Sequence, residues 1–224
     1  MLCLTETWHD ADSAVLGRLR CNGYNVVDRP RPRAVGADDL SVNHGGVLVM
    51  ASADISLSPI AVPDQPSTFQ MVCVRAVAEQ FSAIVVAVYR PGSVAVQQSF
   101  HDELASVLDR VAVYQEPIYV VGDVNIRLDR DDDPHADQLR LLVDCYGLVL
   151  HSTGRTHQLG GTLDAVITHN TTGCPSHVVT KDVGLSDHFL LQWEVNATRA
   201  ERPTVPVCSR PWRRLDIECF RSHW

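Results

Sequence analysis

Short runs of apolar, β-branched residues recur along this chain and constrain its fold more than any other feature. Runs of this kind predict strands. They lie at residues 2–5, 24–28, 46–51, 69–77, 83–89, 118–122, 163–168, 178–181 and 189–195. Many are apolar at every position, as in the Ala-Ile-Val-Val-Ala-Val of residues 83–88, which is typical of central strands covered on both faces. The sequence therefore predicts β-sheets that are buried on both sides.

Helical periodicity is predicted at residues 13–19, 94–113 and 134–146. In the longest of these stretches the apolar side chains fall on one stripe. Its members are Phe100, Leu104, Val107, Leu108 and Val111. Many strands with so few helices between them favour a layered α/β sandwich over a strictly alternating parallel fold.

Composition excludes several classes of protein. The chain has 224 residues, of which 45% are hydrophobic, and this fits a soluble globular domain. No apolar run reaches the roughly 18 residues of a membrane helix, so no membrane partner is expected. The net charge of −8 means that any binding of a nucleic acid must be local. Seven cysteines without a Cys-x-x-Cys pair favour a reducing, intracellular compartment over a disulfide framework.

Polar side chains stand at the ends of several predicted strands. They are Glu6, Tyr89, Asp123, Asn125, Asp164, Asp187 and His188. Any one of them, taken alone, is more simply explained as a loop residue or a cap. Because carboxylates, a histidine and a tyrosine recur at so many strand ends, the set as a whole predicts a metal-assisted hydrolytic site.

The chemistry of phosphodiester hydrolysis accounts for the carboxylates in this set. Mg²⁺ prefers oxygen ligands and usually keeps several waters, so one or two carboxylates suffice to hold it. Glu6 and Asp187 are the candidate ligands. An attacking water needs a base, and Asp123 is the candidate for that role, with Asn125 orienting groups beside it.

The remaining residues of the set suit the charge that develops on the phosphate. A protonated His188 would stabilise that charge, and Asp164 would set the tautomer and orientation of His188. The Tyr89 hydroxyl is expected to donate a hydrogen bond to a phosphate oxygen.

Arginine supplies almost all of the positive charge. Lys181 is the only lysine among the 19 basic residues. This bias fits bidentate phosphate binding, and it fits a GC-rich coding sequence at least as well. Arg29, Arg31 and Arg33 alternate with prolines at the start of a predicted loop over residues 29–44, and we predict that they contact the substrate.

Ordered motifs give the chain a family resemblance. They are Leu-Thr-Glu-Thr-Trp at 4–8, Val-Tyr-Arg-Pro at 88–91, Gly-Asp-Val-Asn at 122–125, Gly-Thr-Leu-Asp at 161–164 and Ser-Asp-His at 186–188. Together they resemble the endonuclease/exonuclease/phosphatase superfamily. Within it, the chain is most similar to the apurinic-like endonuclease domain of non-LTR (LINE-type) retrotransposons. The His-Gly-Gly-Val at 44–47, Thr156 and the Arg-rich tail at 210–221 are typical of that branch.

The resemblance implies a four-layer α/β sandwich in which two packed mixed β-sheets are flanked by helices. It implies a domain over residues 1–196 and an Arg/Pro-rich linker over 197–224, leading toward a reverse transcriptase in a longer polyprotein. The implied activity is Mg²⁺-dependent nicking of target DNA, with Mn²⁺ as an alternative ion. Such an activity places the protein in the nucleus.

The resemblance also implies roles for individual residues. Glu6 is the main metal ligand, and Asp187 lies close to the metal. Asp123 and Asn125 match the base and its neighbour, Asp164 matches the partner of His188, and Tyr89 matches a tyrosine that contacts phosphate. Thr156 matches a residue that lines the site, and Ser186 opens the last motif.

One departure from the family pattern affects the expected activity. The pattern begins with a strand that ends in an asparagine and with a helix, both ahead of the strand that carries the glutamate. Met1 lies inside that later strand, so we expect the first strand and helix to be missing and the nicking activity to be impaired or absent. Two alternatives stay open: a non-catalytic retroelement remnant, and a superfamily phosphatase acting on inositol or lipid phosphates.

Overall fold

A six-stranded sheet forms the centre of the molecule. The structure, a computed structural model, describes residues 1–32, 45–62, 64–151, 153–169 and 177–195. The strands are β4 (Ser56–Pro59), β5 (Gln70–Ala78), β6 (Phe81–Tyr89), β7 (Ile118–Asp123), β8 (Leu148–Leu150) and β9 (Asp164–His169). Their order across the sheet is β4-β5-β6-β7-β9-β8. The β6–β7 pair is parallel and the other pairs are antiparallel, so the sheet is mixed.

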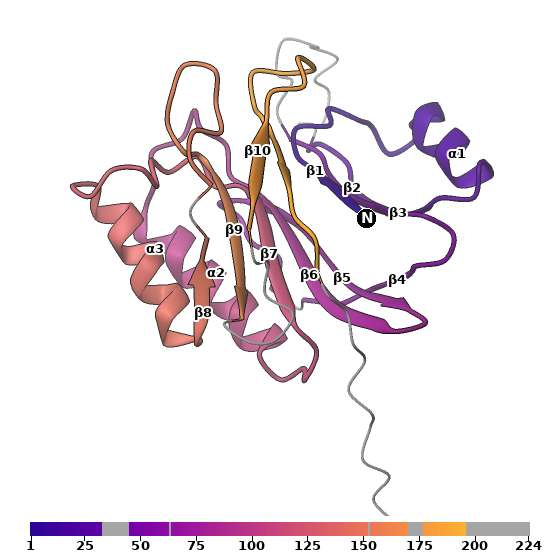
Figure 1. Cartoon of the computed structure of the whole chain (residues 1–224), viewed down its shortest axis with the longest axis horizontal. Helices are drawn as coiled ribbons and strands as arrows, with labels where there is room; N and C mark the ends of the chain where they lie inside the picture. The colour runs from indigo at the N-terminus through magenta and orange to yellow at the C-terminus, as the bar shows by residue number, and fades with distance from the viewer. Residues whose placement is uncertain (33–44, 63, 152, 170–176, 196–224) are drawn as a thin grey trace, which may run out of the picture.

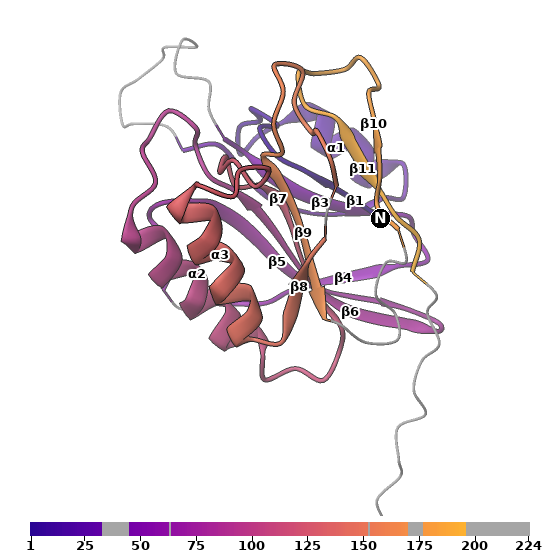
Figure 2. The same cartoon turned by 60° about the vertical axis from the view of Figure 1, so that its left-hand side comes forward.

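A smaller sheet packs against one face of the central sheet (Figures 1 and 2). It consists of β1 (Leu2–Leu4), β3 (Val47–Ala51) and β2 (Asn25–Arg29) in the order β1-β3-β2, with antiparallel pairs. A two-stranded antiparallel ribbon of β10 (Val179–Lys181) and β11 (Leu190–Gln192) lies beside it. Valines of both sheets meet in one buried cluster, which includes Val49 of β3 and Val74 and Val85 of the central sheet.

Helices cover the two outer faces (Figure 1). On one side, α2 (Gln98–Val111) and α3 (Pro134–Cys145) pack on the central sheet. On the other, α1 (Ala14–Cys21) lies beside β2, away from the central sheet. The layers therefore run helix, sheet, sheet, helix, which confirms the predicted four-layer sandwich.

The position of β6 inside the central sheet explains why its sequence is apolar throughout. Ile84, Val86 and Val88 belong to the cluster with the α2 and α3 side chains. The alternate residues Val85 and Tyr89 belong to the cluster between the sheets. Successive side chains of a strand point to opposite faces of the sheet, so the side chains on both faces of β6 are buried. The same alternation places Tyr89, the last residue of β6, on the side of the smaller sheet.

Two strands of the structure have no counterpart among the predicted ones, and some predicted elements are longer than the observed ones. Strand β4 is a mostly exposed edge strand that ends in Pro59, and β8 has only three residues, so neither gives a strong apolar signal. The helix predicted from residue 94 begins at Gln98, after a turn in which the Val94 N–H donates to the Pro91 carbonyl. The strand pairs of the smaller sheet and of the β10–β11 ribbon are antiparallel. Two mixed sheets were expected, and among the described residues the central sheet is the mixed one.

Two further expectations concern the linker and the membrane. The predicted linker at 197–224 lies outside the described residues. None of the helices in the described part of the chain has the length and apolarity needed to cross a bilayer.

Candidate active site

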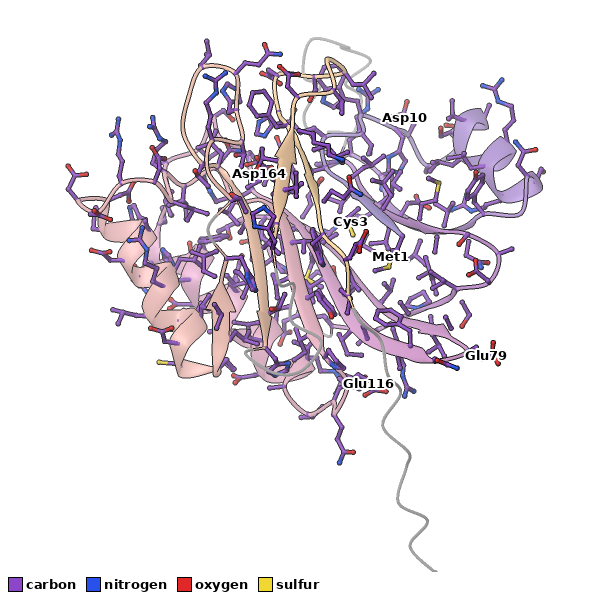
Figure 3. All side chains as sticks on the ribbon, in the orientation of Figure 1. Met1, Cys3, Asp10, Glu79, Glu116 and Asp164 are labelled. Carbon is purple, nitrogen blue, oxygen red and sulfur yellow. The ribbon has the colours of Figure 1, made fainter. Side chains whose placement is uncertain are left out.

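The predicted site residues gather at one end of the central sheet. Tyr89 is the last residue of β6, Asp123 ends β7 and Asp164 begins β9. In the register of the sheet, Tyr89 lies opposite Asp123, and Asp123 lies opposite Asp164. Figure 3 shows Asp164 at this end of the sheet, whereas Glu116 lies at the opposite end.

Gly122 allows β6 and β7 to lie close together just before the site. A Cβ atom at this position would lie 2.1 Å from the carbonyl oxygen of Val88, and the backbone φ is +128°. Only glycine adopts such a conformation without strain. The glycine of the Gly-Asp-Val-Asn motif is therefore required by the packing of the strand that presents Asp123.

Asp123 is buried and held by Asn125. The Asn125 backbone N–H donates to Asp123 Oδ1 at 2.9 Å, and the Asn125 side-chain Nδ2 donates to Asp123 Oδ2 at 2.7 Å. Asn125 has a φ of +50°, in the left-handed region that asparagine tolerates better than most residues. Asn125 Nδ2 also donates to the carbonyl oxygen of Arg90, at 2.8 Å. Asn125 thus fixes the orientation of Asp123, and the catalytic roles of both residues stay predictions.

His188 lies between two carboxylates. Its Nδ1 is 2.9 Å from Asp164 Oδ2, and its Nε2 is 3.9 Å from Asp123 Oδ2. The hydrogen bond to Asp164 and the charges of the neighbouring carboxylates raise the pKa of His188, although burial acts against this. Burial and the negative charge of Asp164 raise the pKa of Asp123, and the charge of Glu6 adds to the effect. The arrangement therefore favours a protonated imidazole beside the predicted base.

Thr156 links the two segments that carry Asp164 and His188. Its side chain is fully buried, and Oγ1 accepts hydrogen bonds from the backbone N–H groups of Leu163, at 2.9 Å, and Asp164, at 3.2 Å. Its carbonyl oxygen accepts from the N–H of Phe189, at 2.8 Å. Thr156 therefore connects the start of β9 with the segment that carries His188.

Glu6 reaches the site from the smaller sheet. The Tyr89 hydroxyl donates a hydrogen bond to Glu6 Oε1. Burial, followed by this hydrogen bond and the negative charge of Glu6, raises the pKa of Tyr89, so the phenol keeps its proton. Because that hydrogen is directed at Glu6, the tyrosine orients the candidate metal ligand in this structure. The predicted contact of Tyr89 with phosphate stays a prediction.

Asp187 and Ser186 form a turn next to His188. Asp187 is exposed, and its Oδ2 lies 3.2 Å from Nε2 of His157. The Ser186 hydroxyl oxygen accepts from the backbone N–H of His188, at 3.1 Å. Ser186 thus shapes the turn that presents the imidazole, and its predicted contact with substrate stays untested.

Sequence reasoning did not assign a role to Arg90. It is 4% exposed, and its guanidinium donates to backbone carbonyl oxygens of four residues. They are Pro91, Val94, Val124 and Asn125. Arg90 thereby joins the end of β6 to the turn after β7. Its place directly after Tyr89 in a buried strand was the available signal, because a buried arginine needs several hydrogen-bond acceptors.

Two arginines of the predicted basic loop lie within the described residues. Arg31 is buried, and its Nε donates to Asp10 Oδ1 at 2.9 Å. Arg29 donates to Gln65 Oε1 at 2.8 Å. Arg33 lies outside the described residues. Arg29 and Arg31 thus have partners within the protein, and their role in substrate binding stays a prediction.

The donor chemistry of the site suits a hard divalent cation. Glu6 and Asp187 are exposed carboxylates, engaged through Oε1 and Oδ2 respectively in the contacts described above. Oxygen donors accessible to a hydrated ion are what Mg²⁺ requires. Two triplets in the described part of the chain bring ligand atoms within 4.8 Å of one another, and Glu6 belongs to neither. They are Asp123, Asp164 and His188, and His157, Asp187 and His188.

Comparison with solved structures identifies proteins of the same fold. The 3′ phosphatase NExo from Neisseria, bound to a product DNA hairpin, has a TM-score of 0.59 and 18% identity, covering 87% of this chain and 88% of that chain. The endonuclease domain of TRAS1, a telomere-specific non-LTR retrotransposon, has a TM-score of 0.59 and 16% identity, covering 77% and 78%. The human Nocturnin catalytic domain has a TM-score of 0.55 and 14% identity, covering 85% and 80%.

Sequence comparison decides the family. No curated protein sequence matches the chain. The family model described as endonuclease/exonuclease/phosphatase matches residues 1–188, which include all of the ordered motifs. The solved structures, at identities below 20%, show the shared fold alone. The chain therefore belongs to the endonuclease/exonuclease/phosphatase family, whose members are hydrolytic nucleases and phosphatases.

Proposed function

We propose that this chain is the endonuclease domain of a non-LTR retrotransposon protein and hydrolyses one strand of target DNA with a divalent metal ion. One observation carries the proposal: His188 is held between Asp164 and Asp123, and Asn125 fixes Asp123 through both of its carboxylate oxygens. This arrangement supplies a base and a cationic group at the same place. In-line attack on a phosphodiester needs both.

Asp123 takes the proton of the attacking water. Its two hydrogen bonds from Asn125 hold the carboxylate in one orientation, and its raised pKa makes it a better proton acceptor than an ordinary aspartate. The imidazolium of His188 stabilises the negative charge that develops on the phosphate. Asp164 keeps the Nδ1–H of His188 engaged and so directs Nε2 toward the reacting group.

Glu6 and Asp187 are the residues that would hold Mg²⁺, or Mn²⁺ in its place. When bound, the ion supplies electrostatic stabilisation of the phosphate oxygens. Tyr89 orients Glu6 for this role through its hydroxyl group. Glu6 follows β1 of the smaller sheet, and its charge acts on Asp123, whereas Asp187 lies in the turn before β11, and its charge acts on His188.

The cellular setting is part of the proposal. A domain over residues 1–196, a linker over 197–224 and a reverse transcriptase beyond it would place the cut strand at the polymerase as a primer. The partner is DNA, and the location is the nucleus. Because the net charge is −8, we expect DNA binding to depend on a few loops, with Arg29, Arg31 and Arg33 as the predicted contacts.

Nicking of supercoiled plasmid DNA in Mg²⁺ or Mn²⁺ tests the proposal. The wild-type chain should produce open circles with a 3′-hydroxyl end, at the reduced rate that its sequence leads us to expect, and Asp123→Asn and His188→Ala should each lower that rate at least about 100-fold. Asp102→Asn, on the exposed face of α2, is the matched control and should leave the rate unchanged. Cleavage that persists in the Asp123 and His188 variants would contradict the proposal.

The same protein preparations separate the two alternatives. Release of inorganic phosphate from inositol phosphates or phosphorylated lipids, without nicking, would identify a phosphatase. Inactivity of the wild type on every substrate, with normal cooperative unfolding, would identify a non-catalytic remnant.

A further inference from the structure

A second histidine, His157, adjoins the proposed site. Its ring lies edge-to-face with the ring of His188, with centroids 4.8 Å apart and an interplanar angle of 80°. The backbones of these residues form an isolated antiparallel bridge. The His157 side chain is only 13% exposed, while the Asp187 side chain that it contacts is 68% exposed.

The hydrogen bonds of His157 determine which nitrogen carries the hydrogen. Its Nδ1 accepts a hydrogen bond from the backbone N–H of Leu159, at 3.1 Å, so Nδ1 carries no hydrogen. The hydrogen of the ring is therefore on Nε2. Nε2 lies 3.2 Å from Asp187 Oδ2 and donates to it.

Backbone hydrogen bonds join the two segments that carry His157 and Asp187. The Gln158 N–H donates to the Asp187 carbonyl oxygen at 2.8 Å, and the Phe189 N–H donates to the Thr156 carbonyl oxygen at 2.8 Å. The segment with His157 and the segment with Asp187 therefore cannot slide past each other. The exposed carboxylate of Asp187 would otherwise rotate freely, so the imidazole limits its orientation.

His157 could instead be read as a metal ligand, because its ligand atom lies within 4.8 Å of those of Asp187 and His188. A ligating Nε2 must offer a lone pair, which requires the hydrogen to be on Nδ1 and donated to an acceptor. His157 has the opposite arrangement, because its Nδ1 faces a backbone donor.

We propose that His157 is a positioning residue, which holds the Asp187 carboxylate toward the metal through an Nε2–H donor and does not itself ligate the ion. The proposal rests on the proposed function, in which Asp187 is a metal ligand. An oriented carboxylate loses less conformational freedom when the ion binds. Donors of this kind around metal-ligating carboxylates typically change metal affinity or activity about 10–100-fold when removed.

Two substitutions of His157 separate the effect of its N–H donor from the effect of its aromatic ring. His157→Phe keeps an aromatic ring next to His188 and removes the donor, whereas His157→Gln keeps an N–H donor at similar reach. His169→Phe is the matched control, because His169 is also half-buried and also accepts a backbone N–H at Nδ1, but it lies at the opposite end of β9. In plasmid nicking, His157→Phe should need about 10–100-fold more Mg²⁺ for half-maximal rate. His157→Gln and His169→Phe should stay close to the wild type.

Two measurements on the full chain do not depend on catalysis. Long-range ¹H–¹⁵N NMR of the imidazoles should show His157 of the metal-free wild type with its hydrogen on Nε2. Calorimetric titration with Mn²⁺ should show weaker binding to His157→Phe than to the wild type and His157→Gln. A hydrogen on Nδ1, or equal Mn²⁺ affinity in all variants, would overturn the inference.

The outcomes distinguish this inference from the proposed function. A wild type that binds Mn²⁺ but cuts no DNA contradicts the function, while the NMR and the titration still decide the role of His157. A wild type that nicks DNA, with an unchanged Mg²⁺ requirement in a folded His157→Phe, overturns the role of His157 and leaves the function standing.

Discussion

At the scale of single residues, the carboxylates of the site each meet a neighbouring polar side chain. Asp123 accepts from Asn125, Glu6 accepts from Tyr89, and Asp164 is bonded to His188. The sequence identified these residues because they follow or precede apolar strands. It could not identify how they pair, since Tyr89 and Glu6 are 83 positions apart and meet only when the two sheets pack.

Arg90 gives a prediction at this scale. Arg90→Lys should lower the free energy of unfolding by about 2–3 kcal/mol, because one ammonium group cannot satisfy the buried carbonyl oxygens that the guanidinium serves. The turn that carries Asn125 should loosen, so the nicking rate should fall as well. Urea denaturation and plasmid nicking measure the two effects. Arg110→Lys is the control, since exposed Arg110 donates to one carbonyl oxygen at 3.3 Å, and an equal loss in both variants would contradict the argument.

At the scale of elements, helix α2 is tied to the segment before β5 by one carboxylate. Glu103 accepts hydrogen bonds from the backbone N–H and hydroxyl groups of Ser67 and Thr68. Burial opposes ionisation, but these donors prevail and lower the pKa of Glu103 to about 2. The folded protein therefore binds this proton less readily than the unfolded chain. The contribution to stability is complete above the ordinary glutamate pKa and is lost as the pH falls toward 2.

Replacing Glu103 tests this connection. Glu103→Gln should lower the free energy of unfolding by about 1 kcal/mol at pH 7, because the amide accepts fewer and weaker hydrogen bonds. The difference from the wild type should shrink between pH 4.5 and pH 2, as measured by urea denaturation over that range. Glu79→Gln, in the exposed turn between β5 and β6, should show no such difference. A difference that does not vary with pH would contradict the assignment.

The contact between α2 and α3 contains two stacked histidines, of which His101 is buried. The rings of His101 and His135 stack with centroids 5.8 Å apart, and His101 is 3% exposed. Within the described residues, both ring nitrogens of His101 are buried without a hydrogen-bond partner. Burial, and then the neighbouring His135, lowers the pKa of His101. The unfolded chain therefore takes up this proton first, and stability falls as the pH drops below about 6.5.

His101→Leu should remove part of that acid sensitivity. We expect the variant to be as stable as the wild type at pH 7, or more stable by about 1 kcal/mol, because buried polar atoms without partners are replaced by apolar ones. The loss of stability between pH 7 and pH 5 should be smaller than in the wild type. Urea denaturation at the two pH values measures it, and an unchanged or larger loss in the variant would rule out His101 as the cause.

At the scale of the whole molecule, the site depends on how two sheets pack. Glu6 follows β1 of the smaller sheet, whereas Tyr89, Asp123 and Asp164 belong to the central sheet. Val49 of β3 is fully buried between the sheets and lies opposite Cys3 of β1. Val107 of α2 is equally buried on the other face of the central sheet.

Because Val49 and Val107 lie on opposite faces of the central sheet, their substitutions separate an effect on stability from an effect on the site. Val49→Ala and Val107→Ala should each cost roughly 1–3 kcal/mol, because each leaves a small cavity in a packed core. Only Val49→Ala should also change the site, by letting the strand that precedes Glu6 shift relative to Tyr89. We expect a higher Mg²⁺ requirement for nicking in this variant alone, measured well below both melting temperatures. Equal Mg²⁺ requirements in the two variants would mean that the packing between the sheets does not position Glu6.

The amino-acid sequence by itself determined the layered α/β class and the residues at the strand ends. Both are local properties: apolar runs define buried strands, and polar residues next to such runs stand at their ends. Tertiary structure decided which donors meet which carboxylates, because those contacts join segments far apart in the chain. It set the backbone N–H of Leu159 against Nδ1 of His157, buried Arg90 among carbonyl oxygens and turned Arg31 toward Asp10. A side chain's identity sets its possible hydrogen bonds, and only the packing of distant strands selects among them.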